Sequence, residues 1–185
     1  GLYHPGLMQT PDMDMWCRLL IDWPIRVIPE KLTLHRIFTN KSNTSSSARP
    51  EVHIRTANEL NHVRRHFLRL KNATEVYQIF PELADSFAPS DDANVKFLLA
   101  MACLHCTRSP SAWSLGLEWL FELLDDSVTQ AELARVYNFT YPQLMALTGA
   151  FDVHGNADRI KRSALEATVA ENQKEIQRLW GEIHR

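Results

Sequence analysis

The chain has 185 residues, of which 45% are hydrophobic, and its 20 Lys and Arg residues against 22 Asp and Glu residues give a formal net charge of −2. This length and hydrophobic content suffice for one domain with a buried core, and only six glycines argue against a turn-rich sandwich or barrel. The slightly negative charge argues against a domain devoted to binding nucleic acid, although a total charge says nothing about one local basic patch.

The sequence pattern of residues 1–50 predicts an arm that precedes the main helical body. Thr10 stands at an N-cap position with Pro11 directly after it, and a helix of about residues 11–23 follows. Its apolar residues recur at i, i+3, i+4 and i+7, and this apolar face of the arm comprises Trp16, Leu19, Leu20 and Trp23. Large aromatic groups are common at interfaces, so this face is a candidate partner surface, although folding back onto the body is the default expectation.

The segment that follows this helix is expected to connect the arm to the body. Residues 39–50 are rich in Ser, Thr and Asn and predict a linker. Residues 25–38 fit either a short extended piece between two prolines or a helix that begins at Pro29, and the pattern does not choose between them. We therefore expect residues 51–185 to form the helical domain.

The main body carries a series of helix signals. Thr56 and Glu59 have the spacing of a capping box and predict the start of a helix. Residues 95–106 are apolar nearly all round, which indicates a central helix packed on several sides. We count about seven helices and almost no period-two alternation. The prediction is an all-α fold, a compact bundle of about seven helices with an N-terminal arm and a long C-terminal helix.

The segment at about residues 128–148 resembles the helix-turn-helix of bacterial and phage regulators. Asn138 stands at the turn, where a left-handed backbone is needed and where Asn is tolerated better than most residues. The pattern continues with an apolar residue after the turn, a cap for the second helix and two inward-facing leucines, which are Phe139, Thr140, Leu144 and Leu147. An ordinary helical hairpin inside a bundle would need the same turn and cap signals.

The resemblance implies that the second helix enters the major groove of DNA. Its outward side chains would then contact bases and phosphates, and these are Thr140, Tyr141 and Gln143. Neighbouring cations would contact the DNA backbone, and these are Arg135, Arg159, Lys161 and Arg162. The recognition surface itself contains no Arg or Lys, so the ordinary hairpin stays open as an explanation.

The last predicted helix, from about residue 156, carries a seam with spacings of 4, 3, 4, 3 and 4 residues. This heptad seam comprises Leu165, Val169, Asn172, Ile176, Leu179 and Ile183. An asparagine in such a seam fixes register or partner number in coiled coils. The seam predicts either pairing with a partner helix or closure of the domain's own core, and Trp180 beside it favours the second by widening the apolar face.

Candidate catalytic and metal sites are weak in this sequence. Cys103 and Cys106 with His62 and His66 have the residue types of a tetrahedral zinc site, but the cysteines lie in an apolar helical run and arginines flank the histidines. No nucleophile elbow, phosphate-binding glycine loop, zinc-protease motif or dinucleotide fingerprint occurs. We therefore predict no catalytic residue, no metal and no cofactor in a protein that is not an enzyme.

Two hypotheses about function follow. The first is a non-enzymatic helical module for protein–protein interaction, a subunit or adaptor that binds another protein or a second copy of itself. The second is a DNA-binding regulator that dimerises through the C-terminal helix. A DNA-binding role predicts an exposed second helix with the cations on the same side. An adaptor predicts that this helix is buried and that an apolar patch is exposed elsewhere.

The cysteines and the apolar runs give an expectation about compartment. Three cysteines are an odd and small number for a disulfide framework, so we expect an intracellular protein of the cytoplasm or nucleus. The longest apolar run, residues 97–106, is too short to span a bilayer, so we expect no membrane partner.

Overall fold

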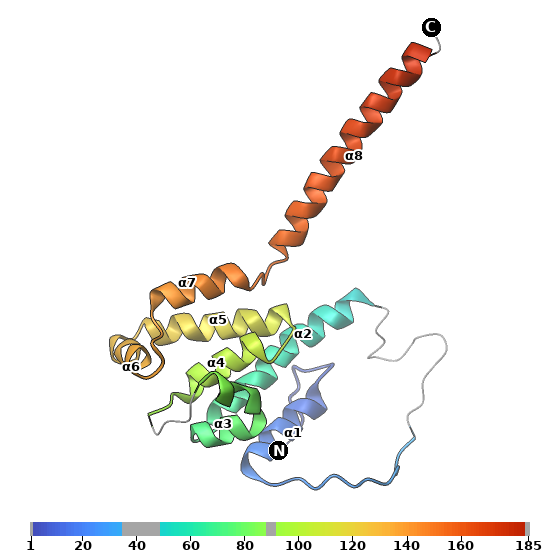
Figure 1. The fold of residues 1–185 in the computed structure, drawn as a ribbon. Coiled ribbons are helices and arrows are strands. Elements are labelled where there is room, and N and C mark those ends of the chain that lie inside the picture. Colours follow the sequence, from blue (N-terminus) through green and yellow to red (C-terminus); the bar gives the residue numbers. More distant parts are fainter. Residues whose placement is uncertain (1, 35–48, 88–91, 184–185) are drawn as a thin grey trace.

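The computed structural model describes residues 2–34, 49–87 and 92–183, which form eight α-helices and two short 3₁₀ helices without any strand in these ranges. The α-helices are α1 (Pro11–Asp22), α2 (Pro50–Arg64), α3 (Ala73–Ile79), α4 (Val95–His105), α5 (Pro110–Leu124), α6 (Ser127–Tyr137), α7 (Tyr141–Ala150) and α8 (Asn156–Ile183). The 3₁₀ helices are η1 (Arg65–Arg69) and η2 (Pro81–Asp85). The predicted all-α bundle with an arm and a long last helix is confirmed (Figure 1).

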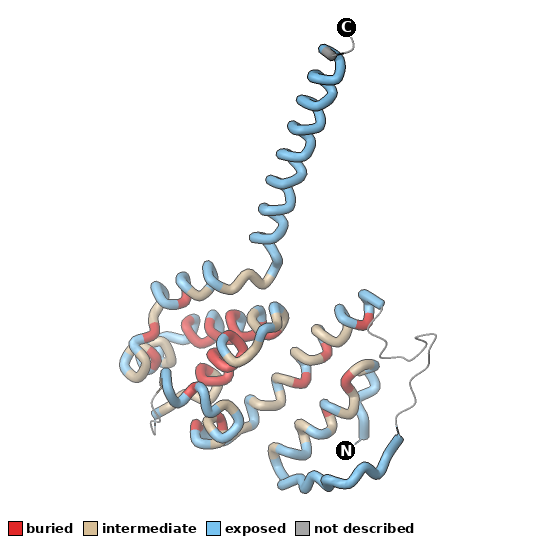
Figure 2. The backbone as a smooth tube through the Cα atoms, turned by 45° about the vertical axis from the view of Figure 1, so that its right-hand side comes forward, coloured by how far each residue is buried: buried red, intermediate tan, exposed pale blue. Residues whose placement is uncertain are grey.

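The core is built around α4, as the apolar run predicts. Every residue of α4 from Phe97 to Leu104 is buried, and α5 lies along it with a buried face of its own (Figure 2). Gly116 of α5 sits at a close approach of the two helices, because a Cβ there would lie 2.8 Å from the carbonyl oxygen of Ala100. The pair α4 and α5 is therefore the rod around which the other helices pack.

Gly116 should tolerate no side chain, and this gives a matched test. We expect Gly116→Ala to lower the free energy of unfolding by about 1–3 kcal/mol, since the backbone oxygen it meets cannot rotate away. The control is Gly149→Ala in α7, where nothing lies within 4 Å and the lost flexibility should stabilise the chain by roughly 0.5–1 kcal/mol. Urea denaturation of both variants measures the difference, and equal effects would contradict this account of the α4–α5 contact.

The start of α2 differs from the sequence prediction. The capping box at Thr56 and Glu59 is wrong, because α2 begins six residues earlier at Pro50 and both residues lie inside the helix. Thr56 instead donates its hydroxyl to the carbonyl oxygen of Val52 at 2.7 Å, while Glu59 turns toward the arm. Pro50 stands at the first helical position, where the fixed backbone angle of a proline favours a helix start. This signal, and not the Thr56–Glu59 spacing, marks where α2 begins.

The helix α8 leaves the body as a single projecting rod (Figure 1). Its 28 residues correspond to a length of about 42 Å. No other described helix makes a contact with it, and its described residues are exposed along the whole length (Figure 2). Within the described ranges, no helix combines the length and the apolar character needed to cross a bilayer.

Parts of the predicted arm lie outside the described residues. The predicted helix of about residues 11–23 is present as α1, and residues 24–34 continue without helix or strand. Most of the linker predicted at 39–50 and the last residues of the ambiguous segment 25–38 are outside the description. Within the described part of the arm, α1 folds back onto η1 and α2.

Candidate functional site

The heptad seam on α8 faces solvent rather than the core. Its aliphatic side chains retain 65% exposure at Leu165, 47% at Val169, 53% at Ile176 and 43% at Leu179. Asn172 is exposed as well, and Trp180 beside the seam is 61% exposed. Ile183 ends the helix, and its side chain lies outside the described residues. In the isolated chain this helix therefore does not close the domain's own core.

The arm docks onto the body through buried polar groups. Glu59, 6% exposed, accepts hydrogen bonds from the backbone N–H groups of Met8, Gln9 and Thr10 at 2.9, 2.7 and 2.8 Å. The Thr10 hydroxyl donates to the same carboxylate at 3.2 Å, so Thr10 starts α1 without capping it by its side chain. One carboxylate thus satisfies three backbone donors that precede the first turn of α1.

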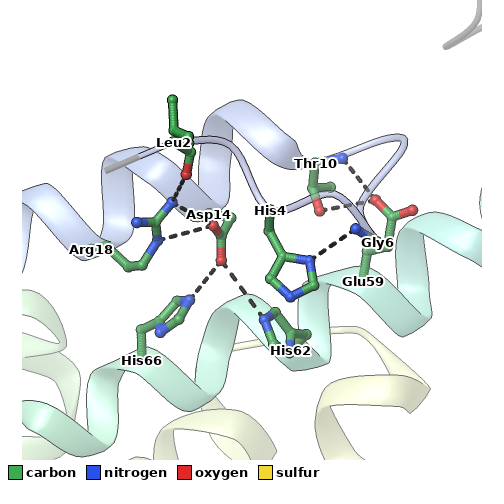
Figure 3. A network of polar contacts seen from close by, with 9 residues as sticks. All are labelled: Leu2, His4, Gly6, Thr10, Asp14, Arg18, Glu59, His62 and His66. Atoms are coloured by element: carbon green, nitrogen blue, oxygen red, sulfur yellow. Dashed lines mark hydrogen bonds and ion pairs between the residues drawn. The ribbon is translucent and has the colours of Figure 1, made fainter.

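A second buried carboxylate, Asp14 of α1, lies against two histidines of the body (Figure 3). The Oδ1 atom of Asp14 is 2.6 Å from Nε2 of His66 and 3.9 Å from Nε2 of His62. Its Oδ2 atom accepts from Arg18, whose Nε and Nη2 atoms lie 3.0 and 2.9 Å away. His4 completes the group, with its ring centroid 4.9 Å from that of His62.

Both carboxylates are held in the charged form. Burial raises the pKa of Asp14, but the hydrogen bonds and positive charges of His66 and Arg18 outweigh it and leave the pKa below its ordinary value. Burial also raises the pKa of Glu59, and the three backbone N–H groups with the Thr10 hydroxyl bring it below its ordinary value. The polar attachment of the arm is therefore strongest where both groups are ionised.

The polar attachment turns the apolar face of the arm outward. Trp16 is 50% exposed, Leu20 55% and Trp23 68%, while Leu19 is 37% exposed. Asp14, on the opposite face of the same helix, is only 1% exposed. The arm folds back as expected by default, but with the polar face inward, so the predicted apolar surface remains accessible.

The two helices and the turn predicted at about 128–148 are present as α6, Asn138 and α7. Asn138 ends α6 with φ 50° and ψ 36°, which is the left-handed conformation that the turn requires. Phe139 and Leu144 are buried, and Thr140 with Gln143 forms a capping box at the start of α7. Most of α7 is exposed, as a DNA-binding role predicts and an adaptor role does not.

The candidate DNA contacts are largely engaged within the chain. Gln143 accepts through Oε1 from the backbone N–H and hydroxyl of Thr140, and the Tyr141 hydroxyl donates to the carbonyl oxygen of Leu124 at 3.1 Å. Arg135 forms an exposed ion pair with Asp92 at 3.0 Å.

The candidate cations are divided between two places. Arg159, Lys161 and Arg162 are exposed at the start of α8, where Arg159 donates to Asn156 at 2.6 Å. Arg135 belongs to α6, and α6 and α8 join opposite ends of α7 (Figure 1). The four cations therefore do not form one patch beside the start of α7.

The cysteines and histidines do not assemble as a two-Cys, two-His set. Cys103 is buried in α4, where burial raises the pKa of its thiol to about 11 and suppresses thiolate chemistry at neutral pH. His62 and His66 instead lie with Asp14, a residue that the sequence analysis does not single out. Two histidines one turn apart are the only local signal for this cluster.

Comparisons of this chain with protein families, curated proteins and solved structures found no match.

Proposed function

We propose that this chain is a non-enzymatic assembly subunit that pairs with a second copy of itself through α8. The exposed heptad seam on a helix without contact to the body carries the proposal. Exposed aliphatic side chains in a row of period 3.5 gain free energy when a matching helix covers them. Three features of the seam favour a second copy in parallel orientation as that helix.

The first feature is the side-chain shape at alternating seam positions. Val169 and Ile176 are β-branched and occupy a positions, whereas Leu165 and Leu179 occupy d positions. This distribution favours parallel pairs of two helices over trimers or tetramers.

The second feature is Asn172. In a parallel pair in register, Asn172 faces its own counterpart, and the two amides can hydrogen-bond to each other. An antiparallel alignment of the same seam sets Asn172 against Val169 or Ile176 of the second helix, which leaves a buried amide without a partner. Since an unsatisfied buried amide costs about 1–3 kcal/mol, the parallel alignment is favoured.

The third feature is the charge beside the seam. In a parallel pair, the g position of one helix lies near the e position of the other, five residues further on. Lys161 occupies a g position and Glu166 the matching e position, so each copy offers an attractive pair to the other. Trp180 at a later e position would cover the end of the seam.

The oligomeric state of the full chain tests the proposal. At tens of micromolar, sedimentation equilibrium is expected to give twice the chain mass of 21.3 kDa. We expect Ile176→Asp combined with Leu179→Asp to return the mass to that of one chain, because two charges would be buried at each layer. The matched control is Ile160→Asp, which changes an equally apolar residue, 68% exposed, that lies off the seam.

Two results would contradict this proposal. A wild-type chain that stays monomeric at roughly 200 µM would leave no role for the seam in self-association. The dissociation constant of such a dimer would exceed the ordinary cellular concentration of a protein. A seam variant that still dimerises would place the interface elsewhere. Lys161→Glu tests the orientation, because in the parallel pair it faces Glu166 of the second copy and should weaken pairing.

DNA binding remains the second candidate function, supported by the exposed α7 and the left-handed turn at Asn138. The absence of Arg and Lys from α7 and the engagement of Gln143 weigh against it. Anisotropy of labelled duplex DNA over a series of salt concentrations tests this function, because binding through contacts to the DNA phosphates weakens steeply with salt.

A further inference from the structure

We propose that Asp14, His62 and His66 form a binding site for a zinc-like divalent metal ion between the arm and the body. The candidate ligand atoms, one carboxylate oxygen and two imidazole nitrogens, all lie within 4.8 Å of one another. They come from two segments separated by about fifty residues, since α1 supplies the carboxylate, α2 supplies His62 and η1 supplies His66 (Figure 3). Bound metal would therefore join the arm to the body.

The distances suit a tetrahedral centre after a small adjustment. Zinc bonds of about 2.0–2.2 Å place two ligand atoms of a tetrahedron roughly 3.3–3.5 Å apart. The Oδ1 atom of Asp14 lies 2.6 Å from the His66 nitrogen and 3.9 Å from the His62 nitrogen, so one gap must widen and the other close. The first gap must widen by about 0.7–0.9 Å and the second must close by about 0.4–0.6 Å, changes that small side-chain rotations supply.

The surroundings leave the site accessible. Leu2, Tyr3, His4 and Pro5 line an open cavity of about 290 Å³ together with Asp14, Arg18 and both histidines. His62 is 46% exposed on its side chain and His66 19%, so an ion can reach their nitrogens from solvent. The ring of His4 lies tilted beside that of His62, but its Nδ1 atom accepts from the backbone N–H of Gly6, so we expect water as the fourth ligand.

Arg18 sets the expected affinity. Its guanidinium binds the Oδ2 atom of Asp14 and fixes the carboxylate, which leaves Oδ1 turned toward the histidines. The same positive charge repels a cation, so we expect micromolar binding rather than the tighter binding of structural zinc sites. Metal binding to Nε2 of His66 would replace the hydrogen bond between this atom and Oδ1 of Asp14.

Calorimetry with Zn²⁺ on the chelator-treated full chain tests the site. We expect one ion per chain, with an affinity reduced more than about tenfold by His62→Gln and by His66→Gln. The matched control His154→Gln, an exposed histidine outside the cluster, should bind as the wild type does. Hydrogen exchange of residues 11–22 should slow on addition of Zn²⁺ in the wild type and change little in His62→Gln, because the ion would join α1 to the body.

Zn²⁺ binding by the three free cysteines is the alternative to binding at the proposed site. The absorption spectrum of bound Co²⁺ distinguishes thiolate ligands from histidine and carboxylate ligands. At the proposed site, Co²⁺ should give the visible absorption of a tetrahedral centre without a thiolate charge-transfer band. Binding that persists in both histidine variants, or that is lost in Cys103→Ser combined with Cys106→Ser, would overturn the proposal. So would a wild-type chain that binds no Zn²⁺ at about 1 mM.

Discussion

Replacement of Phe97 by alanine is expected to lower the free energy of unfolding by about 3–5 kcal/mol. Phe97 is fully buried in α4, and its ring stacks on that of Tyr137 with centroids 4.3 Å apart. The rings of Phe87 and Phe139 meet it edge to face at 5.5 and 5.1 Å. The substitution would therefore leave a cavity where α4 meets the end of α6 and the turn after it.

The effect of Phe97→Ala should be strongest at the helical hairpin. Urea denaturation measures the loss of global stability, and hydrogen exchange of residues 127–150 shows whether α6 and α7 loosen more than α5. Phe121→Ala is the matched control, because Phe121 is 50% exposed on α5 and should cost less than about 1 kcal/mol. A loss below about 1 kcal/mol for Phe97→Ala would show that this aromatic cluster does not hold the hairpin.

Replacement of Glu59 by alanine is expected to weaken the docking of the arm by about 1–3 kcal/mol. The change removes the acceptor of three backbone N–H groups and one hydroxyl, and of these donors the N–H and the hydroxyl of Thr10 are buried. Hydrogen exchange of residues 11–22 should then approach that of an unprotected peptide, while α4 and α5 keep their protection.

The control for Glu59 lies on the same helix. Glu51→Ala removes an exposed carboxylate, 3.8 Å from Arg49, and should change stability by less than about 0.5 kcal/mol. Glu59→Gln should fall between the two, because it keeps one oxygen acceptor without the charge. Protection of the arm that survives Glu59→Ala would mean that Asp14 and its neighbours dock the arm by themselves.

The docking of the arm should depend on pH in a defined direction. Since Glu59 and Asp14 both have a lowered pKa in the folded chain, their stabilisation is fully present above the ordinary carboxyl values of about 3.9–4.3. This stabilisation is lost as the pH falls through the lower pKa values that the two carboxyl groups have in the folded chain. The contribution of Glu59 to the exchange protection of α1 should therefore stay level from pH 7 to 5 and decline only in stronger acid, with a smaller decline in Glu59→Gln.

Local patterns predict much of this fold because local physics decides it. The apolar run in α4 predicts a buried rod, since such a helix can avoid water only by packing on all sides. Asn138 and the Thr140–Gln143 pair predict a turn and a helix start because the left-handed backbone and the capping hydrogen bonds involve neighbouring residues only. The order and type of the helices follow from signals of this kind.

The attachment of the arm could not be predicted in this way. Glu59 matches a local capping pattern with Thr56, but its partners lie about fifty residues earlier in the chain. The apolar stripe of α1 predicts that Trp16 and Trp23 face inward when the arm folds back, whereas Asp14 takes that place. The hydrogen bonds and ion pairs of two buried carboxylates decide which face of α1 packs on the body, rather than the apolar stripe. The spacing of apolar residues along one helix carries no information about partners that lie far away in the sequence.

The rod-like α8 has a consequence for how partners would meet this protein. If two copies align in parallel, both bodies stand at the same end of one stem, and each presents its outward tryptophans there. A ligand with two matching epitopes would then be held bivalently, and its avidity would exceed the affinity of a single arm by orders of magnitude, provided that its spacing fits. In such an arrangement, weak binding by each arm alone is sufficient for tight binding of the bivalent ligand.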